Sequence, residues 1–126
     1  MADFLSDEWV DGLRMLGGEL PPMQGASVSC QHEISGTPEG KMRFYTVWID
    51  GVLSDVAKGK LDNPDCLISA KYENAKEILS GVNTAEAAFM QGDLKVEGDY
   101  KKFLIDLHGW RQSPEYKKLW KDLGSF

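Results

Sequence analysis

KMRFYTVWIDGVLSDVAK, residues 41–58, decides the fold. Two runs rich in aromatic and β-branched residues flank the dipeptide Asp50-Gly51, and such residues favour strands. A type I′ turn needs positive φ at both central positions, which Asp-Gly supplies readily. The stretch therefore predicts an antiparallel hairpin with strands at 41–49 and 52–58. Because the first of these strands is apolar on both faces, we expect it to be the central and most buried one.

Upstream of the hairpin, residues 27–34 alternate between polar and apolar side chains, which predicts a strand with one solvated face. The positions on its apolar face are Val28, Cys30, His32 and Ile34. Further upstream, apolar residues recur at helical spacing between Ser6, a suitable cap, and Gly17-Gly18, which end the helix. The apolar positions of this helix are Leu5, Trp9, Leu13 and Leu16.

Downstream of the hairpin, the turn LDNPD at 61–65 introduces a short strand at 66–70, and residues 94–97 alternate as a fifth strand. The other periodic segments are helical: one before Gly81, one capped by Asn83, one capped by Asp99 with the stripe Phe103, Leu107 and Trp110, and one over 114–123 capped by Ser113. This grouping predicts an α+β fold. We expect one domain, residues 1–126, with a mainly antiparallel five-stranded meander and helices packed on one face.

The composition excludes several classes of protein. The formal net charge of -6 and the pI near 4.8 are unsuited to a nucleic-acid partner. No apolar run is long enough to span a membrane, and the acidic N-terminal segment does not resemble a signal peptide. We therefore expect a cytoplasmic protein in which Cys30 and Cys66 are free buried thiols.

The charge is unevenly distributed, because residues 100–126 carry six basic and three acidic side chains in an otherwise acidic chain. Two interpretations stay open. The lysines belong either to solvated helix faces or to a surface of the C-terminal helix that contacts an anionic membrane or a ligand headgroup transiently.

The stretch AKEILSGVNTAEAAFMQGDLKVEGDYKKFLIDL, residues 75–107, resembles the C-terminal half of a sterol carrier protein type 2 domain. The resemblance extends upstream to Trp48-Ile49-Asp50-Gly51 and to the strand that follows Asp65, so that it covers about residues 44–107. It rests on the order and spacing of glycines and core positions. The chain ends in Gly-Ser-Phe, which differs from the Ser-Lys-Leu type of peroxisomal address found in eukaryotic members.

This resemblance implies an apolar cavity between sheet and helices that holds a sterol, fatty acid, fatty acyl-CoA or phospholipid. Burial of each methylene group contributes roughly 0.8 kcal/mol, so such a site needs little polar chemistry. The candidate lipid-binding residues on the surrounding elements are Phe89, Met90, Leu94, Phe103, Leu104, Leu107, Trp110, Leu119, Trp120 and Leu123. Each of them is also explained by ordinary core packing. The 114–123 helix is accordingly either a lid over the cavity or a part of the core.

The sequence shows no catalytic motif, no metal-ligand spacing and no requirement for a cofactor. His32 and Cys30 share a strand face, but no third ligand or orienting acid accompanies them, so we interpret His32 as a core histidine. The expected function is non-enzymatic binding and transfer of a lipid. The alternatives are a small enzyme or accessory subunit acting on a hydrophobic acyl or steroid substrate, and a dimerisation or partner-binding module that would form a homodimer.

Overall fold

The computed structural model describes residues 6–79, 85–103, 108–111 and 113–123. Its elements in chain order are α1 (Asp7–Gly18), β1 (Val28–Thr37), β2 (Gly40–Ile49), β3 (Val52–Lys58), β4 (Cys66–Lys71), α2 (Tyr72–Leu79), α3 (Ala85–Gln91), β5 (Leu94–Gly98), α4 (His108–Arg111) and α5 (Pro114–Leu123). The five strands form one sheet in the order β3-β2-β1-β4-β5.

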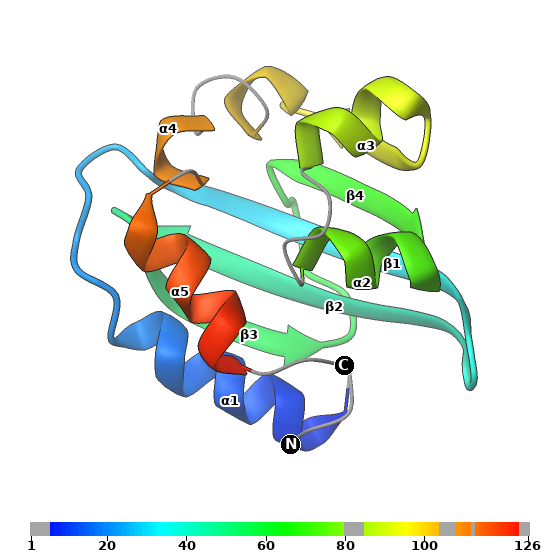
Figure 1. Cartoon of the computed structure of the whole chain (residues 1–126), viewed down its shortest axis with the longest axis horizontal. Helices are drawn as coiled ribbons and strands as arrows, with labels where there is room; N and C mark the ends of the chain where they lie inside the picture. Colours follow the sequence, from blue (N-terminus) through cyan, green and yellow to red (C-terminus); the bar gives the residue numbers. More distant parts are fainter. Residues whose placement is uncertain (1–5, 80–84, 104–107, 112, 124–126) are drawn as a thin grey trace.

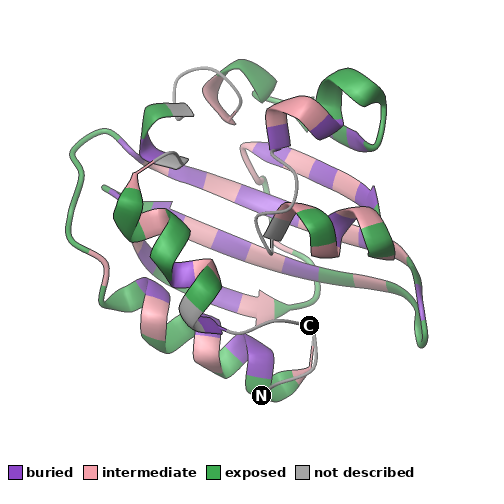
Figure 2. Cartoon of the chain, in the orientation of Figure 1, coloured by how far each residue is buried: buried purple, intermediate pink, exposed green. Residues whose placement is uncertain are grey.

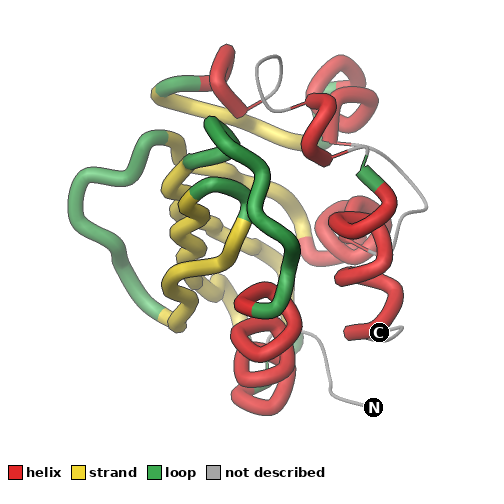
Figure 3. The backbone as a smooth tube through the Cα atoms, turned by 90° about the vertical axis from the view of Figure 1, so that its left-hand side faces the viewer, coloured by secondary structure: helices red, strands yellow, loops and turns green. Residues whose placement is uncertain are grey.

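The helices gather on one side of the sheet, with α5 and α2 over its middle and α1 along the β3 edge (Figure 1 and Figure 3). We call the covered side the inner face. The pair β1 and β4 is parallel, and the other neighbouring pairs are antiparallel. The predicted α+β class, with a mainly antiparallel five-stranded sheet and helices on one face, is confirmed.

The β2–β3 hairpin forms as predicted. Asp50 has φ 48° and Gly51 has φ 81°, as a type I′ turn requires. The turn also holds the segment before β1, because the Met23 N–H donates to the Asp50 carbonyl at 2.6 Å and the Gly25 N–H donates to the Asp50 carboxylate at 3.1 Å. A Cβ on Gly51 would lie 3.0 Å from the Met23 nitrogen, so this position needs glycine for both space and conformation.

The expectation of a simple meander with β2 at its centre was wrong. The central strand is β1, which pairs with β2 on one side and, in parallel, with β4 on the other. The chain after β3 therefore crosses to the far side of β1 instead of turning back beside β3. Ile49 at the end of β2 is 53% exposed, so the apolar outer face of that strand reflects β-propensity more than burial.

Two polar side chains of β1 hold this crossing in place. The Gln31 side chain accepts a hydrogen bond from the Leu61 N–H at 2.6 Å and donates to the Gly59 carbonyl at 2.9 Å. Ser29 and Asp65 exchange hydrogen bonds, from the Ser29 N–H to the Asp65 carboxylate and from the Asp65 N–H to the Ser29 hydroxyl, at 3.0 and 2.8 Å. These bonds place the start of β4 beside β1 and set its register.

The strands follow the predicted alternation. On β1, Val28, Cys30 and Ile34 are buried on the inner face, and Ser29 and Glu33 are half-buried on the outer face. Figure 2 shows the same alternation of buried and less buried positions along the sheet. The inner face of the sheet is therefore the surface on which the core is built.

The first helix covers the edge of the sheet. The Ser6 hydroxyl accepts a hydrogen bond from the Trp9 N–H at 3.1 Å, which confirms the predicted cap. On the same helix, Arg14 donates to the Val56 carbonyl of β3 at 2.7 Å. A Cβ on Gly17 would lie 2.6 Å from Leu53, so the helix and strand approach as closely as glycine allows. The α1 helix thus satisfies an edge group that would otherwise be open to pairing.

The caps of the C-terminal helices also follow the sequence. The Asp99 carboxylate accepts a hydrogen bond from the Lys102 N–H at 3.2 Å, and the Ser113 hydroxyl accepts one from the Tyr116 N–H at 3.3 Å. The predicted cap at Asn83 lies outside the described residues.

Candidate functional site

Most of the predicted lipid-binding residues that the structure describes lie in the apolar interior. The buried ones are Leu94, Trp110, Leu119 and Leu123. Phe103 and Trp120 are partly buried and pack against the core. These side chains reach the interior from β5, α4, α5 and the residues that follow β5, so the structure brings together segments that are distant in the sequence.

Two further predicted residues, Phe89 and Met90, lie outside this interior. Phe89 and Met90 lie at the surface of α3, and Met90 is 83% exposed. Leu104 and Leu107 lie outside the described residues. Phe89 and Met90 therefore contact a lipid buried under the helices only if α3 moves.

A chain of aromatic rings fills the space between α1, α5 and the β2 side of the inner face. Its members, called here the aromatic cluster, are Trp9, Phe44, Trp48, Trp110, Tyr116 and Trp120. Trp9 contacts Phe44 edge to face at a centroid distance of 5.5 Å and stacks on Trp120 at 6.4 Å. Such ring pairs contribute beyond the area that they bury.

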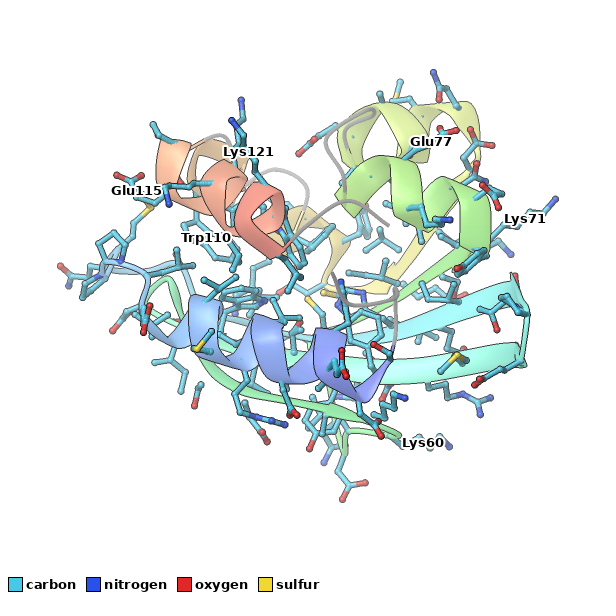
Figure 4. All side chains as sticks on the ribbon, turned by 60° about the horizontal axis from the view of Figure 1, so that its bottom comes forward. Lys60, Lys71, Glu77, Trp110, Glu115 and Lys121 are labelled. Atoms are coloured by element: carbon cyan, nitrogen blue, oxygen red, sulfur yellow. The ribbon has the colours of Figure 1, made fainter. Side chains whose placement is uncertain are left out.

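The α5 helix is packed through this cluster as a core helix is packed. Leu119 and Leu123 are buried, and a Cβ on Gly12 of α1 would lie 2.9 Å from Leu123. The apolar stripe predicted for the helix thus faces the protein interior. Figure 4 shows Trp110 beneath α5 and Lys121 pointing outward from it.

The other half of the inner face is lined by smaller residues. The α2 helix packs on β1 and β4, and α3 packs on β5. Their buried side chains, called here the alanine cluster, are Ala75, Ala85 and Ala88. The strands beneath them present Ile68, Ala70, Leu94 and Val96.

His32 lies between the two halves, on the inner face of the central strand. Its ring stacks on Phe44 with a centroid distance of 4.4 Å and an interplanar angle of 3°. Its Nε2 lies 3.3 Å from the Thr46 hydroxyl. The residue as a whole is half-buried. Burial nevertheless lowers the pKa of His32 from 6.5 to about 4, because desolvation disfavours the imidazolium.

Two thiols adjoin this histidine on the same face. Cys30 and Cys66 are direct partners in the parallel pairing of β1 and β4, and their Sγ atoms lie 3.8 Å apart. Both are buried free cysteines, as predicted. The hydrogen bond with Cys30 lowers the pKa of the Cys66 thiol, against the opposing effect of burial.

A surface hollow of about 170 Å³ opens at one end of the aromatic cluster. The residues around it are Leu20, Pro21, Pro22, Met23, Gly51, Trp110, Ser113, Glu115 and Tyr116. It lies where the β2–β3 turn meets α4 and α5. A volume of this size holds only part of a long-chain lipid.

Neither a metal site nor a membrane-spanning helix occurs among the described residues. No group of three or more His, Cys, Asp or Glu side chains in this part of the chain is arranged to hold a metal ion. None of the helices described here is long and apolar enough to cross a lipid bilayer. The polar groups beside His32 on the inner face are the Thr46 hydroxyl and the thiols of Cys30 and Cys66.

Solved structures share this fold. The crystal structure of a sterol carrier protein 2 superposes with a TM-score of 0.70 at 16% identity, covering 96% of this chain and 97% of that one. A conserved hypothetical protein of Thermus thermophilus gives 0.66 at 14% identity, covering 98% and 92%. Palmitated SCP2L2 of Aedes aegypti gives 0.63 at 17% identity, covering 85% and 94%. At these identities the likeness establishes the fold.

The sequence itself establishes the family. The model of the SCP-2 sterol transfer family matches residues 29–104, more than half of the chain. The protein therefore belongs to this family, as the resemblance in the sequence indicated. No curated protein matches the chain significantly.

His32 lies on the inner face of β1, as the alternation of the strand predicted, and packs there on Phe44. Its neighbour Thr46 was not singled out from the sequence. The available signal was that a histidine and a threonine interrupt the inward-facing positions of two strands that are otherwise apolar. Their proximity follows from the β1–β2 register, in which His32 pairs with Phe44 and Cys30 pairs with Thr46.

Proposed function

We propose that this protein binds one lipid in the apolar space between the inner face of the sheet and the helices, and carries it without chemical change. The observation that carries the proposal is the composition of that interior, where large apolar side chains surround a few neutral polar groups. Apolar burial alone contributes roughly 0.8 kcal/mol per methylene group, enough to hold a long chain or a sterol ring system. Membership of the SCP-2 sterol transfer family supports the same function.

The space for the ligand is best placed on the α2 and α3 side. The α1 and α5 side is occupied by the aromatic cluster, whose rings pack on one another and on α1. The alanine cluster presents small side chains to the sheet, so a modest outward shift of α2 and α3 would admit a ligand above β1 and β4.

We further propose that the ligand is collected from or delivered to an anionic membrane through the outer face of α5. Lys117 and Lys121 are exposed on the side of this helix that faces away from the core. Each basic residue close to an anionic surface contributes about 1 kcal/mol of attraction. The buried stripe of the same helix keeps this face outward.

Two measurements test the carrier function. Native mass spectrometry of the freshly purified protein should reveal an added mass equal to that of a lipid. After delipidation, the protein should bind a fluorescent fatty acid or sterol saturably at one site, and the ligand extracted after prolonged incubation should have an unchanged mass. Absence of both co-purified lipid and saturable binding would refute the proposal, and a changed ligand mass would favour an enzyme.

A further inference from the structure

His32 occupies a distinctive place in the interior. It lies on the central strand β1, and its partners across the sheet are Phe44 on β2 and Ile68 on β4. Both partners are buried apolar residues. The imidazole is therefore a polar group in the middle of an apolar surface, at the boundary between the aromatic cluster and the alanine cluster.

The ring is held in one orientation and still has bonding capacity. Stacking on Phe44 fixes its plane, and the Thr46 hydroxyl lies within hydrogen-bond distance of Nε2. Within the described residues, Nδ1 has no hydrogen-bond partner, and the residue as a whole is half-buried. A neutral imidazole offers one donor and one acceptor nitrogen, so Nδ1 is able to bind one further polar atom.

The surroundings of the ring carry no compensating positive charge in the part of the chain that is described. The charged residue in the same cross-strand row is Lys58, which lies beyond Phe44 and pairs with Asp7 of α1 at 3.0 Å. The other polar neighbours, Thr46 and the thiols of Cys30 and Cys66, are neutral groups. The lowered pKa of His32 agrees with a neutral ring at physiological pH. An ionised ligand group placed here would lose its hydration without gaining a counter-ion.

We propose that His32, positioned by Thr46 and Phe44, is the polar anchor of the lipid site and selects a lipid whose buried end is a neutral hydroxyl group, as in a sterol or a fatty alcohol. This inference rests on the proposed carrier function and adds a ligand class to it. The hydroxyl forms a hydrogen bond with Nδ1, and the hydrocarbon extends from it over the inner face. A hydroxyl both donates and accepts, so it suits either tautomer of the ring.

The test compares two lipids of equal chain length, hexadecanol and palmitate, at about pH 8, where a carboxylic acid is ionised. Their dissociation constants are measured by competition with a fluorescent lipid on the delipidated full chain. The unmodified protein should prefer hexadecanol by about tenfold or more, because the carboxylate would be buried without a counter-ion. His32→Phe keeps an aromatic ring against Phe44 but removes the anchor. It should therefore weaken the binding of hexadecanol by about tenfold and change the binding of palmitate much less.

Two further variants separate anchoring from packing. His32→Gln retains a donor and an acceptor and should restore much of the preference for hexadecanol. Thr46→Val removes the hydroxyl that orients the ring, with little change in side-chain shape, and it should reduce the preference for hexadecanol. This variant still tests the inference if His32→Phe does not fold. Met15→Ala, on the exposed surface of α1, serves as the control and should leave the ratio of the two constants unchanged.

Each outcome bears on a separate statement. If the unmodified protein binds both lipids equally, or palmitate more tightly, the inference is overturned while the carrier function stands. The inference also fails if His32→Phe and Thr46→Val both leave the ratio of the constants unchanged. If the unmodified protein carries no co-purified lipid and binds neither these lipids nor the fluorescent probe, the carrier function itself is refuted.

Discussion

The two halves of the inner face solve the same packing problem with different side chains. Over β2 and β3, rings from α1, α4 and α5 interlock in the aromatic cluster. Over β4 and β5, helices α2 and α3 approach the sheet with the alanine cluster. Interlocked rings resist displacement, because protein interiors are close-packed and have low compressibility. We therefore expect the aromatic half to supply stability and the alanine half to yield to a ligand.

The comparison is tested most strongly at Trp9. This side chain is fully buried and contacts both Phe44 and Trp120. Trp9→Ala should lower the free energy of unfolding by about 3–5 kcal/mol, because it leaves a large cavity in the aromatic cluster. Denaturant titration followed by circular dichroism measures the loss.

Met15→Ala on the same helix provides the matched control. Met15 is 61% exposed, so its truncation should change the free energy of unfolding by no more than about 0.5 kcal/mol. Equal losses for the two variants would mean that the aromatic half is not the stable one.

The sequence predicted the elements of both halves but not how they meet. The hairpin, the inner face of β1 and the caps at Ser6, Asp99 and Ser113 are local features, set by alternation, turn chemistry or a side chain a few residues away. The parallel pairing of β4 with β1 depends on bonds such as that between Ser29 and Asp65, which are 36 residues apart. No local pattern encodes such a pairing, and this explains why a meander was expected.

The candidate site shows the same limit. Large apolar residues such as Leu119 and Trp110 were predicted to face the interior, because helical periodicity marks one face of a helix. Whether that face meets a ligand or other side chains depends on the neighbouring helices. Met90 was chosen for its flexibility and size, yet α3 turns it to the surface. Periodicity and residue type were therefore insufficient to separate lining from surface positions on a short helix.

The boundary between the halves should respond to pH through His32. Its pKa is lowered from 6.5 to about 4 in the folded protein, so the unfolded chain binds a proton more readily in this window. The contribution of the neutral ring to stability is complete above about pH 6.5 and is lost as the pH falls toward 4. The loss amounts to at most about 3.5 kcal/mol at about 1.4 kcal/mol per pKa unit.

Comparison with His32→Phe isolates this contribution, since the carboxylates of both proteins titrate alike. The free energy of unfolding should fall more steeply in the unmodified protein than in the variant between the two pKa values. If the free energy of unfolding of the two proteins varies with pH in the same way, His32 is solvated in the folded state and does not lie in a water-free boundary between the two halves.

The alanine half should be sensitive to added volume. Ala88 is fully buried in α3, and Ala88→Leu should cost about 1–3 kcal/mol if α3 cannot move away from the sheet. If α3 yields as a ligand site requires, the cost should lie at the lower end of this range and lipid binding should weaken, because the added side chain occupies the same space. Denaturant titration and lipid competition on one preparation measure both effects.

An exposed position on the same helix gives the reference for that variant. Met90→Leu alters α3 without adding volume to the interior, and it should change neither quantity appreciably. A large loss in the free energy of unfolding for Ala88→Leu, with unchanged lipid affinity, would place the ligand elsewhere. The difference between the two halves would then have no bearing on ligand binding.

The smallest effect on stability is expected at the outer face of α5. Exposed lysines usually change the free energy of unfolding by less than about 0.5 kcal/mol, so replacement of Lys117 and Lys121 by Gln should leave stability nearly unchanged. Binding to vesicles with anionic lipids at low salt should nevertheless weaken by about 2 kcal/mol, since each basic residue contributes about 1 kcal/mol at such a surface. Vesicle co-sedimentation measures the difference.

A second pair of lysines distinguishes local contact from net charge. Lys60 and Lys71 are exposed at positions far from Lys121, as Figure 4 shows, and their replacement by Gln removes the same total charge. If α5 docks on the membrane, only the α5 pair matters strongly, and its effect disappears at high salt because ions screen exposed charges. Equal losses from both pairs would instead indicate attraction without orientation. The rigid aromatic half would then have no particular role in presenting the protein to a membrane.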